Sequence, residues 1–293
     1  MTVEQHALQF ECQSCALLGI LSLPVSPLPR GVLIVTGGPQ YRAGSHRQFA
    51  LLAEHLANLG IPVLRFDYRG MGDSEGEPRT FEHIADDLKA ATDRFFETVP
   101  GLQELALWGL CDGATAAAFY ACDDKRICAL ILLNPWIRTA HGIARTTLRH
   151  YYIERLVDPQ FWRKLVSGRF KAGAALRSLH QLTQAAYATP VLAHGGPDPV
   201  CGSRPGPSPF VTTPQRLLDS LQRFHGRLLI ILSGDDLTAH ELLDLQRQSP
   251  AWRQLLAKST VQQMTVAHAN HTFSRRIWRD EVHRICAQWI ASW

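Results

Sequence analysis

The stretch LALWGLCDGATAAAF, residues 105–119, places a cysteine at the centre of the pattern GLCDG. An apolar, strand-like run enters this stretch, and a helix-like run of small residues leaves it. A Gly-x-Cys-x-Gly turn between a strand and a helix exposes its central side chain above the sheet, and only small residues fit around it. The pattern therefore predicts a nucleophile turn with Cys111 as the candidate nucleophile. The plainer interpretation is a small residue in a tight turn.

The helix expected to begin near Asp112 bears on the reactivity of this thiol. A helix N-terminus carries partial positive charge, which favours the thiolate form of a neighbouring cysteine. The carboxylate of Asp112 acts in the opposite direction. The sequence therefore predicts two opposed effects on the pKa of the Cys111 thiol, and it does not predict the net shift.

Short apolar runs alternate with longer helical patterns on both sides of this stretch. Such alternation is typical of βαβ units around a mostly parallel central sheet flanked by helices. The expected strands are an antiparallel pair within 6–24 and further strands within 31–38, 61–76 (running into a glycine-rich loop), 105–110, 127–136, 226–236 and 259–271. The expected helices include 47–60, 81–99 and 274–293. The fold class is therefore α/β.

The alternation stops between two of these strands. Residues 137–223 contain helical patterns and no convincing strand, and the part near 189–210 is rich in glycine and proline. We expect a core of 1–136 and 224–293 with 137–223 inserted as a helical cap over the active-site edge.

The expected cap is basic. Between Arg138 and Ala188 there are nine Arg and Lys residues and two acidic ones, in a chain whose net charge is +4. Such a cluster could attract an anionic substrate or an anionic lipid surface, or it could be a solvated face. Arg138 is a candidate substrate-binding residue.

A nucleophile of this kind needs a base, and the base needs an orienting acid. In this topology the acid and then the histidine follow the nucleophile, each on a loop after a later strand. The loop after RLLIILSG offers Asp235 and Asp236, and the loop after VQQMTVAHAN offers His268 and His271. We favour Asp236, because Asp235 directly follows a glycine and is expected in the turn. We favour His271, because His268 still belongs to the strand end.

The oxyanion of the reaction needs backbone N–H groups aimed at it. One is expected from Asp112, directly after the nucleophile, and the other from Gly38 in the glycine-rich loop TGGPQYRAGSH. Gln40 or Tyr41 of that loop could contribute instead, and both are candidate substrate-binding residues.

Four motifs together, GLCDG, FDYRGMGDSEG, SGDDLTA and NHTFS, resemble the α/β-hydrolase superfamily over nearly the whole chain. More narrowly, the combination resembles the first of two hydrolases associated with exosortase A systems in bacteria. The resemblance implies an α/β-hydrolase fold and supplies no substrate. Cysteine replaces the common serine, as in dienelactone hydrolases, and Asn270 precedes His271 where many relatives carry Asp. The loop with Asp73 and Ser74 is expected to shape a turn and not to take part in catalysis.

A Cys-His-Asp triad of this kind is suited to esters, lactones and thioesters. We therefore expect hydrolysis of a small-molecule ester or thioester through an acyl-enzyme, with no metal ion or organic cofactor. One alternative is an acyltransferase that uses the same triad. Another is a non-catalytic partner protein of an exosortase or exopolysaccharide system. The charge pattern does not favour nucleic-acid binding.

The cysteines and the apolar runs bear on the compartment. The seven cysteines are an odd number, the first residues lack a secretory signal pattern, and no apolar run is long enough to span a membrane. We therefore expect reduced thiols and a cytoplasmic protein. Cys12 and Cys15 form a CxxC without a second metal-ligand pair at suitable spacing, so ordinary strand residues are expected there. The oligomeric state is not predicted.

Overall fold

The computed structural model describes residues 3–38, 40–137 and 212–293. Met1–Ile137 and Arg216–Trp293 together form one compact unit. Helix α7 (Thr213–Arg223) contributes the buried side chains of Leu217 and Leu221 to the core of that unit, so the core resumes before the predicted boundary at 224. Ile137, the first residue of the predicted cap, is also buried in this core. Residues 138–211, with the glycine- and proline-rich part of the predicted cap, lie outside the described residues.

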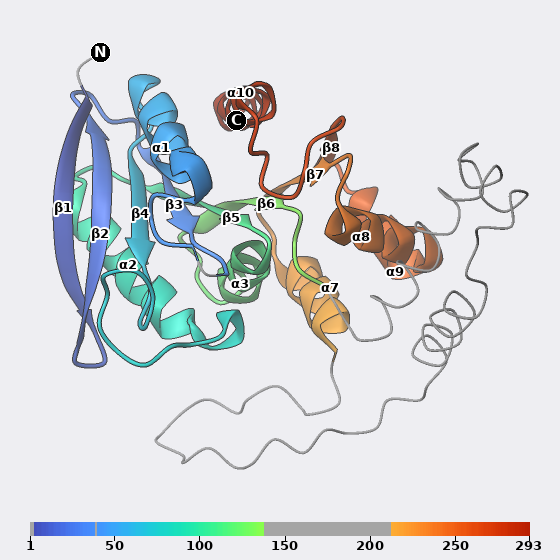
Figure 1. Ribbon diagram of the computed structural model, residues 1–293, viewed down its shortest axis with the longest axis horizontal. Helices are drawn as coiled ribbons and strands as arrows, with labels where there is room; N and C mark the ends of the chain where they lie inside the picture. Colours follow the sequence, from blue (N-terminus) through green and yellow to red (C-terminus); the bar gives the residue numbers. More distant parts are fainter. Residues whose placement is uncertain (1–2, 39, 138–211) are drawn as a thin grey trace, which may run out of the picture. The chain divides into compact units, whose positions relative to one another are not determined.

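The unit is built on an eight-stranded sheet in the order β1-β2-β4-β3-β5-β6-β7-β8 (Figure 1). Strands β1 and β2 are antiparallel, β2 is antiparallel to β4, and all further pairs are parallel. The strands are β1 (Val3–Cys12), β2 (Cys15–Pro24), β3 (Arg30–Val35), β4 (Val63–Asp67), β5 (Glu104–Leu110), β6 (Ile127–Leu133), β7 (Arg227–Ser233) and β8 (Val261–Val266). The predicted mostly parallel sheet is confirmed.

The predicted antiparallel pair at the start is a hairpin that contains the CxxC motif. Cys12 and Cys15 lie opposite each other, and the two turn residues between them, Gln13 and Ser14, both have positive φ, as a type I′ turn requires. Both cysteines carry free thiols, and burial raises the pKa of Cys12 to about 11. The motif therefore forms the turn of a hairpin.

Helices cover both faces of the sheet, as Figure 1 shows. Buried side chains of α1 (Gln48–Asn58) and α10 (Arg276–Ala291) form the core on one face. The other face is covered by α2 (Ala85–Thr98), α3 (Asp112–Ala121), α7, α8 (Leu237–Gln248) and α9 (Pro250–Leu256). Short 3₁₀ turns, Ser45–Arg47 and Phe81–His83, precede α1 and α2. Among the described helices, none has the length and hydropathy that a membrane span requires.

Local sequence explains where two of these helices begin. The side chain of Asp236 accepts a hydrogen bond from the N–H of Ala239 and so caps α8. Ser249 caps α9 in the same way, with Pro250 at the first helical position. The cap of α8 is therefore also the predicted triad acid, and its position is fixed by the helix that it starts.

Candidate active site

The predicted nucleophile turn lies between β5 and α3. Cys111 has φ 60° and ψ −125°, a strained conformation for a residue with a side chain. A Cβ on Gly109 would lie 2.6 Å from the N of Ala114, and a Cβ on Gly113 would lie 2.6 Å from the carbonyl O of Val35. Glycine is therefore required on both sides of Cys111, for the steric reason that the sequence pattern suggested.

Backbone hydrogen bonds hold this turn against the neighbouring strand. The N–H of Cys111 donates to the carbonyl of Leu133 at the end of β6, with an N···O distance of 2.9 Å. The Cys111 carbonyl accepts hydrogen bonds from Ala114, Thr115 and Trp136. Cys111 itself is only partly buried. The thiol is thus fixed at the carboxyl edge of the parallel strands, where catalytic loops of α/β sheets meet.

The structure brings Asp236 and His271 together at the same edge. The Nδ1 of His271 lies 2.9 Å from Oδ2 of Asp236, and the two side chains are 33% and 9% exposed. Burial disfavours the charged form of Asp236, but the hydrogen bond and charge of His271 outweigh it and lower the pKa of the carboxyl. Asp236 is therefore an ionised, fixed partner for the imidazole.

His271 also interacts with the candidate nucleophile. The hydrogen bond with Asp236, followed by one with Cys111, raises the pKa of His271 to about 10, although burial opposes the shift. The imidazole therefore retains its proton at neutral pH. A protonated imidazole at this position can give its proton to a leaving group, as a general acid must.

The two alternative residues form a different contact. Nδ1 of His268 lies 3.8 Å from Oδ2 of Asp235, and these side chains are 86% and 64% exposed. The backbone N–H of Asp235 donates to the carbonyl of Ala269, so Asp235 is held in the turn. Neither residue is positioned beside Cys111 by a contact of the described residues.

Asn134, directly after β6, was missed by the sequence analysis. Its side chain is fully buried, donates to Oγ of Ser233 at 2.6 Å and to the carbonyl of His271 at 2.9 Å, and accepts from the N–H of Ser233 at 2.9 Å. It therefore ties the end of β7 to the loop that carries the histidine. Its only sequence signal is an asparagine before a proline at a strand end.

One predicted oxyanion donor, the N–H of Gly38, faces the side chain of Asp112. The N–H of Gly38 donates to Oδ2 of Asp112 at 2.9 Å, and the N–H of Gly113 donates to Oδ1 at 3.0 Å. Gly38 has φ +56°, which favours glycine. Burial raises the pKa of Asp112, although hydrogen bonds from backbone N–H groups and the charge of His271 act against this.

The other candidates in the loop after β3 have weaker links to the site. Oε1 of Gln40 lies 3.5 Å from the backbone N of Ser45, and Tyr41 is 50% exposed with its ring beside Arg42. Neither contacts the candidate triad through an interaction of the described residues. Arg138 lies outside the described residues.

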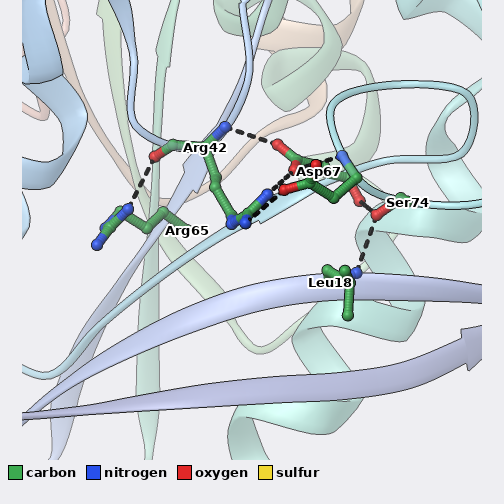
Figure 2. A network of polar contacts seen from close by, with 6 residues as sticks. Leu18, Arg42, Arg65, Asp67 and Ser74 are labelled. Carbon is green, nitrogen blue, oxygen red and sulfur yellow. Dashed lines mark hydrogen bonds and ion pairs between the residues drawn. The ribbon is translucent and has the colours of Figure 1, made fainter.

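A buried carboxylate anchors this loop to the next one, as Figure 2 shows. Asp67, at the end of β4, is fully buried and accepts hydrogen bonds from both the guanidinium and the N–H of Arg42, the latter at 2.6 Å. The N–H of Asp73 lies 3.3 Å from the same carboxylate, and Oγ of Ser74 donates to the Asp67 carbonyl at 2.6 Å. Asp73 and Ser74 thus hold the shape of a turn beside the site.

Solved structures share this fold. An esterase of Pyrococcus furiosus superposes with a TM-score of 0.64 at 16% identity, covering 99% of this chain and 92% of that one. A dienelactone hydrolase of Anabaena variabilis gives a TM-score of 0.58 at 13% identity, covering 100% and 99%. Likeness at such identities concerns the fold, and the predicted α/β-hydrolase fold is confirmed.

Curated relatives match a smaller part of the chain. The polyketide transferase grgF of a Penicillium species is 38% identical over 95 residues, which are 29% of this chain and 31% of that protein. The thiohydrolase aneE of Aspergillus aculeatus is 37% identical over 91 residues, 29% of this chain and 28% of that protein. The match spans less than a third of the length of either relative.

A family model has the broadest sequence match. The model described as serine aminopeptidase, S33, covers residues 29–242, more than half of the 293-residue chain. The matched region contains the nucleophile turn and Asp236 but ends before His271. With the sheet order and the shared fold, this match shows that the chain is an α/β-hydrolase and belongs to the family described as serine aminopeptidase, S33.

Proposed function

We propose that this protein hydrolyses carboxylic esters or thioesters with Cys111 as the nucleophile, His271 as the acid and base, and Asp236 as the orienting acid. The observation that carries the proposal is the His271 imidazole, whose Nδ1 lies 2.9 Å from the buried carboxylate of Asp236 and whose pKa is raised by both Asp236 and Cys111. The family description names a serine enzyme, so cysteine is the feature that distinguishes this chain.

The first half of the proposed reaction forms an acyl-enzyme. The Cys111 thiolate attacks the carbonyl carbon, a carbon–sulfur bond forms, and the π electrons move to the carbonyl oxygen. Backbone N–H groups of Asp112 and Gly38 stabilise this oxyanion. As the oxyanion collapses, the bond to the leaving group breaks, and the leaving group takes the proton of the His271 imidazolium.

The second half releases the acid. Neutral His271 takes a proton from a water molecule as the water oxygen attacks the thioester carbonyl. Collapse of the second oxyanion breaks the carbon–sulfur bond and returns the electrons to sulfur. The carboxylic acid leaves, and the thiolate and the imidazolium are restored.

The substrate class follows from the nucleophile. A thiolate attacks activated carbonyls such as esters, lactones and thioesters, whereas peptide amides are poorer substrates for it. One curated relative is named a thiohydrolase, which supports thioesters as the first substrates to test. An anionic group on the substrate would suit the basic residues between Arg138 and Ala188.

Acyl transfer is the second candidate, because the other curated relative is named a polyketide transferase. The same acyl-enzyme would then be attacked by an alcohol or a thiol in place of water. Product analysis with and without added pantetheine distinguishes the two: a transferase forms acyl-pantetheine in preference to free acid. A role beside exosortase machinery remains a narrower proposal from the sequence motifs.

A panel of p-nitrophenyl esters and acyl thioesters tests the main proposal. We expect turnover by the wild type, loss by roughly a thousandfold or more in Cys111→Ala, and a distinct, slower profile in Cys111→Ser. Cys122→Ala, at the other end of α3, is the matched control and should keep wild-type rates. Equal rates in the wild type and Cys111→Ala would remove Cys111 from the mechanism.

A further inference from the structure

The side chain of Asp112 accepts a hydrogen bond from a backbone N–H group that the proposed reaction needs for the oxyanion. The N–H of Gly38, predicted to stabilise the oxyanion, instead donates to Oδ2 of Asp112 at 2.9 Å. The N–H of Gly113 donates to the other oxygen at 3.0 Å. The negative charge of Asp112 is therefore bound by the same class of donors that an oxyanion would use.

The place for this carboxylate is built into the fold. A Cβ on Gly37 would lie 2.2 Å from Oδ1 of Asp112 and 2.6 Å from the N of Gly113. Any side chain at position 37 would therefore push the carboxylate out. The loop after β3 is itself anchored by the Arg42–Asp67 contacts drawn in Figure 2, so the position of Gly38 does not depend on Asp112 alone.

Two anions cannot use the N–H of Gly38 at the same time. We propose that the Asp112 carboxylate is an internal ligand of the oxyanion hole, which the carbonyl oxygen of the substrate must displace before Cys111 can be acylated. Asp112 thereby sets the acylation rate and disfavours substrates whose carbonyl oxygen is a weak competitor. The inference rests on the proposed function, because it assumes that Cys111 attacks a carbonyl.

Two reactions of the same thiol separate this effect from the general reactivity of Cys111. In acylation by p-nitrophenyl acetate, sulfur adds to the carbonyl, an oxyanion forms, and p-nitrophenolate leaves. In alkylation by iodoacetamide, sulfur displaces iodide from carbon and no oxyanion forms. A change in the thiolate population alters both rates, so the ratio of acylation to alkylation reports on the oxyanion hole.

The experiment measures this ratio in the wild type, Asp112→Ala, Asp112→Asn and Asp123→Ala. Single-turnover acylation is followed with the enzyme in excess, and alkylation at Cys111 is followed by mass spectrometry. Asp123 is exposed and follows the other end of α3, so Asp123→Ala removes the same charge without touching the hole.

We expect the ratio to rise roughly tenfold in Asp112→Ala, because a donor of this kind is worth more than that when it is free. The ratio should rise less in Asp112→Asn, because the amide oxygen of the asparagine still accepts a hydrogen bond from Gly38 but carries no charge. Asp123→Ala should match the wild type. The backbone amide proton signal of Gly38 should shift upfield in Asp112→Ala, independently of any activity.

The remaining outcomes overturn the inference. A lower ratio in Asp112→Ala that Asp112→Asn restores would mean that the carboxylate positions the donors. An unchanged ratio would mean that the contact is absent in the reacting enzyme. Failure of the proposed function itself is distinguishable, because Cys111 would then be alkylated by iodoacetamide but not acylated in any of the proteins.

Discussion

Two aspartate–histidine pairs connect the same two loops of this molecule, one residue apart on the first loop and three on the second. Asp236 and His271 are largely buried and lie 2.9 Å apart, whereas Asp235 and His268 are exposed and lie 3.8 Å apart. An exposed ion pair at the longer distance is screened by water and contributes little to the stability of the fold. The two pairs share their residue types and their loops. They differ in burial, in the helix cap made by Asp236, and in the effect of Cys111, which raises the pKa of His271.

The largest expected effect is the difference in activity between variants that lack one histidine or the other. His271→Ala should lower kcat/KM for an activated thioester by roughly a thousandfold, because both proton transfers depend on it. His268→Ala should leave kcat/KM within a factor of about two, as expected of a surface substitution. Steady-state kinetics with the two variants side by side would measure this. Equal losses in both variants would mean that the two pairs are not functionally distinct.

A smaller loss of activity is expected when the hydrogen bond from Asn134 to the His271 carbonyl is removed. Asn134→Ala removes the donor to the His271 carbonyl and leaves the N–H of Ser233 without its partner. Its φ of 43° also suits asparagine better than alanine. We expect kcat to fall roughly tenfold with little change in KM, and unfolding to become easier by about 1–3 kcal/mol.

The matched control for this variant is Asn58→Ala. Asn58 lies at the exposed end of α1, and its side chain donates to the Glu54 carbonyl within that helix. Kinetics and urea unfolding of both variants should show a change in Asn134→Ala alone. A loss confined to stability, with kcat intact, would reduce Asn134 to a purely structural role.

Much of the fold and part of the candidate site could be predicted from the sequence. The βαβ alternation and GLCDG were enough to predict the sheet, the turn at Cys111 and the two loops that supply an acid and a histidine. The preference for Asp236 over Asp235 relied on the glycine before the pair, because backbone direction in a turn decides which carboxylate points inward.

Other features of the site could not be predicted, because they depend on contacts between residues distant in the chain that no local sequence pattern indicates. Asn134 reaches Ser233 and His271 across two strands, so its role appears only in the folded sheet. The hydrogen bond from Gly38 to Asp112 likewise joins the ends of β3 and β5. The sequence predicted the backbone N–H of Asp112 as an oxyanion donor, and the structure shows the Asp112 side chain accepting a hydrogen bond from Gly38.

The smallest expected effect is on stability as a function of pH. The pKa of His271 is raised from 6.5 to about 10, chiefly by Asp236. A raised histidine pKa contributes stability that is fully present below pH 6.5 and is lost as the pH rises through about 10. The free energy of unfolding of the wild type should therefore exceed that of Asp236→Asn most at about pH 6.

Urea unfolding at several pH values between these limits measures how that gap changes. The gap should be on the order of 1 kcal/mol, because water still reaches part of the imidazole and screens the pair. It should narrow steadily as the pH rises towards 10. Asparagine still caps a helix well, so the start of α8 should not add to the difference. Asp235→Asn, in the exposed pair, should show a gap near zero that does not change with pH. A gap for Asp236→Asn that is equally flat would mean that His271 is not held protonated by its buried neighbour.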